Sequence, residues 1–89
     1  MKKIYKWYLD CGRMGTLDGI FIEDDAIVDA AIGKKYYFDE PLGKHSEVSG
    51  ELVADELTVL SDDQEFIEKF EKIMSKTPSG FNPLEYLED

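Results

Sequence analysis

The chain has very few of the residues that build disulfides and metal sites. Its 89 residues include one cysteine, Cys11, and one histidine, His45. A single cysteine excludes a disulfide within the chain, and a zinc site needs several such ligands. The first residues follow an amphipathic strand pattern instead of a secretory signal. We therefore expect a cytoplasmic protein that holds no metal or other cofactor.

Long apolar runs are also missing. The longest have three or four residues, whereas a helix needs about 20 to cross a bilayer. We therefore expect no transmembrane segment. A hydrophobic fraction of 43% with 12% aromatic residues nevertheless argues against disorder. Because so short a chain has little core to divide, residues 1–89 are expected to form a single domain.

The chain has a large net negative charge, which is unevenly distributed along the sequence. Residues 1–35 contain six basic and six acidic residues, whereas residues 36–89 contain four basic and fourteen acidic ones. The net charge is therefore zero in the first segment and −10 in the second. A surface of this sign repels nucleic acid and anionic membranes and attracts basic protein surfaces. We expect a basic protein partner and no direct binding to nucleic acid or membrane.

Periodicity and turn residues predict a small sheet with two helices. The expected elements are strands at 3–11 and 16–23, a helix at 26–32, strands at 36–38, 47–53 and 57–60, and a long helix after Ser61. Gly19, inside the second strand, indicates a bulge or a close backbone approach. This ββαβββα order predicts an α+β fold, with a mostly antiparallel, curled sheet of about five strands and the long helix packed on one face.

The long helix has the clearest amphipathic pattern. Ser61 and Gln64 have the spacing of a capping box, which places Ser61 at the N-cap. One stripe of the helix contains Phe66, Ile67, Phe70, Ile73 and Met74, and it is expected to lie against the sheet. The predicted core consists of Trp7, Leu9, Phe21, Phe38, Leu52, Val59, Phe66, Phe70 and Ile73. Further on, Asn82 is expected to cap a short final turn that begins at Pro83.

The densest set of reactive side chains is formed by Lys44, His45 and Ser46, in a loop next to Gly43. His45 could act as a general base, and Lys44 with the neighbouring amides could bind an anion. The same residues also fit a polar turn whose side chains bond to the local backbone. Both interpretations are open on the sequence alone.

Two residues of the first turn have alternative roles as well. Cys11 paired with His45 would supply the nucleophile and base of a thiol enzyme, but Cys11 continues the apolar face of the first strand and fits a buried thiol. Arg13 could bind an anionic ligand, although a salt bridge to one of the many carboxylates is the simpler expectation. An alternative function is therefore an anionic-ligand or nucleotide-binding protein, or a minimal enzyme, that uses Arg13, Lys44, His45 and Ser46.

Acids without nearby bases are concentrated between residues 39 and 56. In the long helix, by contrast, Glu65 and Glu68 each precede a lysine by four residues and are largely neutralised. The uncompensated set consists of Asp39, Glu40, Glu47, Glu51, Asp55 and Glu56. On their strand, Glu47 and Glu51 are expected to share the face turned to solvent. These six acids are the predicted partner-binding residues, and a solvated coat that only keeps the protein in solution is the alternative interpretation of the acidic surface.

These observations favour a protein-binding module over an enzyme. A row of carboxylates on a rigid sheet can dock on a basic protein surface, such as that of a nucleic-acid-handling protein, and so act as an inhibitor or adaptor. By occupying a phosphate-binding groove, such a row of carboxylates would act as a nucleic-acid mimic. In size and charge alone, the chain is similar to the small acidic proteins with which bacteriophages block host nucleases and other defences. A subunit of a larger assembly, joined through an apolar face, is a third interpretation.

Overall fold

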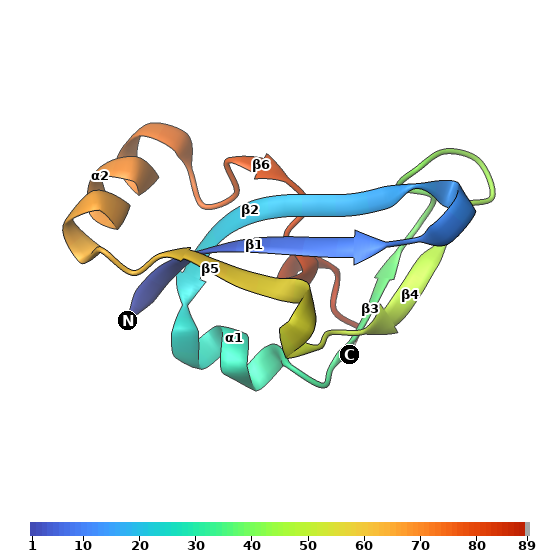
Figure 1. Ribbon diagram of the computed structural model, residues 1–89, viewed down its shortest axis with the longest axis horizontal. Helices are drawn as coiled ribbons and strands as arrows, with labels where there is room; N and C mark the ends of the chain where they lie inside the picture. The colour runs from blue at the N-terminus through green and yellow to red at the C-terminus, as the bar shows by residue number, and fades with distance from the viewer. Residues whose placement is uncertain (89) are drawn as a thin grey trace.

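The computed structural model describes residues 1–88 and has the expected α+β fold (Figure 1). Its strands are β1 (Lys2–Asp10), β2 (Thr16–Asp24), β3 (Lys35–Phe38), β4 (Val48–Glu51), β5 (Leu57–Ser61) and β6 (Ser79–Gly80). Its helices are α1 (Asp25–Ala31) and α2 (Gln64–Met74), with short 3₁₀ turns η1 (Gly12–Met14), η2 (Ala54–Glu56) and η3 (Pro83–Tyr86). The predicted order of strands and helices is confirmed, with β6 in addition. Neither α-helix of the described residues has the length and apolar composition that a membrane span requires.

The strands are divided between two sheets. Four strands form an antiparallel sheet in the order β5-β1-β2-β6, and β3 pairs with β4 in a separate antiparallel sheet. The β1–β2 hairpin is the longest pairing and runs without interruption from Lys2 and Asp24 to Asp10 and Thr16. After β4 the chain passes through η2 and returns as β5 to the outer edge of β1 (Figure 1). The end of β1 and the turn η1 lie near β4.

Gly19 makes the close backbone approach that its position in a strand predicted. It pairs with Gly80 of β6, and the amide of Phe81 donates a hydrogen bond of 3.0 Å to the carbonyl of Asp18. A Cβ atom on Gly19 would lie 1.9 Å from the carbonyl oxygen of Phe81. Only glycine therefore allows the C-terminal segment to lie this close to β2.

An aromatic core joins the two sheets. Trp7 of β1 is completely buried and stacks on Phe38 of β3, with ring centroids 5.4 Å apart. Tyr36 packs edge-on against Trp7 at 5.7 Å, and Phe21 of β2 stacks with Tyr5 at 5.3 Å. Such ring pairs stabilise the fold beyond the burial of their apolar area. The predicted burial of Trp7, Phe21, Phe38 and Leu52 is confirmed, whereas Leu9 and Phe70 are only partly buried.

Three residues that the sequence placed in the core are exposed, so that prediction is wrong for Val59, Phe66 and Ile73. The helix α2 lies at the end of the large sheet where β1 begins (Figure 1). There it packs through buried Ile67 on Ile4 and Ile22. Because α2 covers only this end of the sheet, most of its apolar stripe has no surface to pack against. Val59 is exposed because β5 is an edge strand with a single neighbour.

The start of α2 also differs from the expected capping box. The N-cap is Asp63, whose carboxylate accepts a hydrogen bond of 3.2 Å from the amide of Phe66. Ser61 instead accepts a bond from the amide of Asp63, and the Gln64 side chain donates to the carbonyls of Lys2 and Asp62. Gln64 thus fastens the helix to β1 in place of closing a capping box. The predicted cap at Asn82 is confirmed, since its side chain accepts from the amide of Leu84.

Candidate functional site

Among the described residues, ion pairs occur at only one end of the folded molecule. The seven ion pairs among residues 1–88 join the start of β1, the end of β2, the first turn of α1, and α2 with Lys76 behind it. They include Lys2 with Glu71 at 2.7 Å and Lys76 with Glu23 at 2.5 Å. The negative charge in this part of the molecule is therefore largely compensated within the chain.

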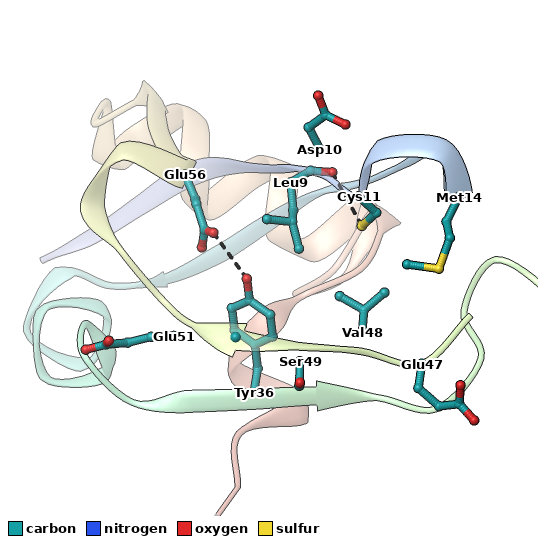
Figure 2. Close-up of a pocket in the computed structure, with 11 residues that line it drawn as sticks. Leu9, Asp10, Cys11, Met14, Tyr36, Glu47, Val48, Ser49, Glu51 and Glu56 are labelled. Carbon is teal, nitrogen blue, oxygen red and sulfur yellow. Dashed lines mark hydrogen bonds between the residues drawn. The ribbon is translucent and has the colours of Figure 1, made fainter. Parts of the chain in front are cut away.

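The opposite end has carboxylates without such partners, and several of them line a groove. This acidic groove, of about 470 Å³, lies between the end of β1, η1, η2 and β4 (Figure 2). Its carboxylates are Asp10, Glu47, Glu51 and Glu56, and no lysine or arginine lines it. Apolar atoms of Leu9, Met14 and Val48 point into the space between them (Figure 2). The groove thus combines a negative rim with an apolar floor.

Both faces of β4 contribute to the groove, Val48 from the inner face and Ser49 and Glu51 from the outer one. Val48 is buried in the core, whereas Ser49 and Glu51 are exposed. Leu52, directly after the strand, is completely buried. This is the predicted division of the strand into an inner apolar face and an outer acidic face. Glu51 therefore stands on the hydrogen-bonded strand and Glu47 directly precedes it, which fixes where the negative charge of Glu51 is presented.

Glu56 is integrated into the fold more deeply than the other acids. One of its carboxylate oxygens accepts from the indole nitrogen of Trp7 at 3.3 Å, and the other accepts from the hydroxyl of Tyr36 at 3.1 Å. Burial, reinforced by the charge of Glu56, raises the pKa of Tyr36. The phenol therefore stays protonated as the donor in this bond. Glu56 satisfies two core donors while its charge adds to the groove.

A second acidic group lies where the loop after β3 meets the start of β4. Oxygen atoms of Asp39, Glu40 and Glu47 lie within 4.8 Å of one another, and all three side chains are exposed. Partial desolvation, together with Asp39 and Glu47, raises the pKa of the neighbouring Tyr37. Asp55 is exposed on η2. The structure therefore brings Glu47, Glu51 and Glu56 to one groove and groups Asp39 and Glu40 with Glu47 beside it.

The residues of the alternative ligand site have different surroundings. Ser46 is buried, and its hydroxyl accepts from the amide of Leu42 at 3.0 Å and donates to the carbonyl of Gly43. Lys44 and His45 are exposed, and the amide of His45, at a φ of 64°, donates to Glu40. The Ser46 hydroxyl thus stabilises the loop, as the polar-turn interpretation predicted.

In the first turn, Arg13 lacks the predicted salt bridge among the described residues, whereas Cys11 has the predicted sheltered thiol. Arg13 is exposed and makes none of the ion pairs found among residues 1–88, so the salt bridge favoured by the sequence is absent from this part of the chain. Cys11 is partly buried, and burial followed by the charge of Asp10 raises the pKa of its thiol. A raised thiol pKa disfavours the thiolate that nucleophilic chemistry requires.

Sequence reasoning missed Asp10, Leu9 and Met14 as parts of the groove. They come from the first hairpin, 34 to 39 residues before β4 begins at Val48, and no local pattern links the two segments. The hydrophobic alternation of β1 indicates only that Asp10 faces away from the core.

No protein-family model matches the chain, and no curated protein or solved structure is significantly similar to it.

Proposed function

We propose that this chain is a small acidic protein-binding module whose acidic groove receives a lysine or arginine side chain from a basic protein surface. It acts as an inhibitor or adaptor and performs no chemistry of its own. A nucleic-acid-handling protein is the favoured class of partner, because its phosphate-binding surface is basic. The free thiol of Cys11 fits a cytoplasmic setting for this interaction.

The observation that carries the proposal is the separation of paired and unpaired charge. At the α2 end, lysines neutralise most carboxylates, whereas four carboxylates around the acidic groove have no basic residue among the groove's lining. A solubilising coat alone gives no reason for such a separation. Complementary charge raises the association rate and selects among partners.

The shape and lining of the groove supply what charge alone does not. Long basic side chains bury their methylene stem on apolar surface and keep the charged head in a polar environment. Leu9, Met14 and Val48 offer that apolar surface, and the carboxylates of Asp10, Glu47 and Glu51 stand at its margins, turned outward to where a charged head would lie (Figure 2). A guanidinium matches a carboxylate with two parallel hydrogen bonds, so arginine fits better than lysine.

The first experiment is titration of the isotope-labelled chain with a short arginine peptide, followed by NMR. We expect the largest amide shifts at residues 9–14 and 47–51, and smaller shifts at α2. Shifts spread evenly over all acidic residues would contradict a specific groove and leave only a general charge effect. His45→Ala is expected to bind the peptide like the wild type, because His45 does not line the acidic groove. Arg13→Ala removes an exposed positive charge from η1 beside the groove and is expected not to weaken binding.

A matched pair of variants separates position from net charge. Glu47→Lys with Glu51→Lys changes the charge by four units at the groove, and Glu65→Lys with Glu68→Lys makes the same change on α2. All four side chains are exposed, so both variants should fold. We expect the groove variant to reduce peptide affinity at least tenfold more than the α2 variant, which corresponds to about 1.4 kcal/mol. An equal loss of peptide affinity in the two variants would contradict the proposal.

A further inference from the structure

The helix α2 has an apolar stripe that the rest of the described chain leaves uncovered. Phe66 is 50% exposed, Ile73 79% and Met74 47%, although all three lie on the stripe that continues to buried Ile67. Phe66 also stacks on Phe70 with centroids 5.6 Å apart, so the two rings form one continuous aromatic patch. Large exposed apolar residues gathered on one helix face are typical of an interaction surface.

Charges along α2 are arranged in a way that identifies a matching surface. Asp62, Asp63, Glu65 and Glu68 lie at its N-terminal half, whereas Lys69, Lys72 and Lys76 lie at or beyond its C-terminal half. The one acid of the second half, Glu71, is paired with Lys2 of β1. The helix is therefore negative at one end and positive at the other. A second α2 laid antiparallel across the stripe would place each acidic half beside a basic half.

We propose that α2 packs against α2 of a second copy of this chain, antiparallel and around a twofold axis. In this arrangement the stripe of Phe66, Phe70 and Ile73 meets the same stripe of its partner, and Glu65 of each copy lies near Lys72 of the other. The pairing is isologous, so both copies bury the same residues. The inference is independent of the proposed function, since it concerns the opposite end of the molecule.

The existing contacts of these charges do not oppose the pairing. Within one chain, Lys69 lies 3.3 Å from Glu65 and Lys72 lies 3.4 Å from Glu68, and all four side chains are more than 70% exposed. Exposed pairs of this kind contribute at most about 1 kcal/mol. They can therefore be exchanged for pairs between two copies at little cost.

The position of α2 also limits repulsion between two chains that each have a net charge of −10. The molecule is 42 Å long. Along this longest axis α2 lies at one end, and the turn between β1 and β2, which borders the acidic groove, lies at the other (Figure 1). Contact through α2 keeps the uncompensated carboxylates of both copies far apart. At physiological salt, where the Debye length is about 8 Å, these charges are largely screened from each other.

The size of the surface indicates a weak dimer. An 11-residue helix is about 16 Å long, which is too short to supply the roughly 800 Å² per partner of a standard interface. Association is therefore expected in the range from micromolar to millimolar protein. The dimer would present two acidic grooves at its far ends, which favours partners with more than one basic site.

Sedimentation equilibrium of the full chain over this concentration range tests the proposal. We expect a monomer–dimer equilibrium whose dissociation constant rises at least tenfold in Ile73→Lys. The control Ile27→Lys makes the same change at an exposed isoleucine of α1 and should leave the equilibrium unchanged. A monomer at every concentration, or a dimer indifferent to Ile73→Lys, would overturn the inference.

A charge exchange tests the antiparallel arrangement and does not depend on loss of function. Glu65→Lys alone places two lysines together at each contact and is expected to weaken the dimer. The double variant, Glu65→Lys with Lys72→Glu, restores opposite charges between antiparallel helices and is expected to recover the wild-type dissociation constant within about twofold. Failure of the double variant to recover, in a chain with an unchanged circular dichroism spectrum, would contradict this arrangement.

Discussion

Tyr36 donates a hydrogen bond of 3.1 Å to Glu56, which links the small sheet to the turn that precedes β5. The same carboxylate accepts from the indole of Trp7 at 3.3 Å. Both aromatic residues are at least 99% buried, and one partly exposed carboxylate accepts the hydrogen bonds from the polar groups of both. A residue that the sequence assigned to the partner-facing surface therefore also stabilises the core.

Replacement of Glu56 by alanine should reduce stability more than replacement of the other groove acids. It removes the acceptor of both Trp7 and Tyr36, and a buried donor left without a partner costs about 1–3 kcal/mol. We expect Glu56→Ala to lower the free energy of unfolding by about 2–4 kcal/mol. Urea denaturation followed by tryptophan fluorescence measures this loss. Glu51→Ala, which removes an exposed acid on β4, serves as the control and should change stability by less than about 0.5 kcal/mol.

High pH should destabilise the protein through Tyr36. Burial and Glu56 raise the pKa of this phenol above its ordinary value, which is about 10 in an unfolded chain. The stabilisation that accompanies this shift is complete below about pH 10 and is lost as pH rises toward the folded-state pKa. We expect urea denaturation to show a fall in stability that begins at about pH 10, continues above it, and is smaller in Tyr36→Phe. Parallel curves for the two proteins would contradict this role.

Substitution of Gly19 by alanine should displace the C-terminal segment from the large sheet. The added Cβ would lie 1.9 Å from the carbonyl oxygen of Phe81, and neither backbone can move without breaking the pairing with Gly80. We expect a loss of stability of about 3 kcal/mol, at the upper end of overpacking effects. Hydrogen exchange should show faster exchange at the Phe81 amide. Gly43→Ala, with no atom within 4 Å of its Cβ and a φ of 108°, measures the cost of strained φ alone.

The N-cap of α2 offers a test of the difference between sequence and structure. Asp63→Ala removes the acceptor of the Phe66 amide and should destabilise the protein by about 1 kcal/mol. Ser61→Ala, at the N-cap that the sequence favoured, should cost less because Ser61 bonds only to the Asp63 amide outside the helix. Thermal denaturation of the two variants shows which substitution lowers stability more. The reverse order would show that Ser61 is the more important cap.

Several features of this fold could be predicted because they depend on neighbours in sequence. The alternation in β1, the outward direction of Glu51, and the cap at Asn82 follow from residues a few positions apart. The same holds for Gly19, since a glycine inside a strand marks a bulge or a close backbone approach. Net charge and its position along the chain are likewise properties of the sequence. These properties alone led to the expectation of an acidic docking surface.

Tertiary structure decided which of these patterns have a partner. The periodicity of α2 shows that Phe66 and Ile73 share a face, but whether that face is covered depends on where the helix lies on the sheet. Asp10 and Glu47 line one groove because the end of the first hairpin lies near β4, a proximity of distant segments that no local spacing encodes. Sequence thus determines the chemistry of each face through short-range periodicity, whereas the packing of distant elements determines which faces are buried, paired or left available for a partner.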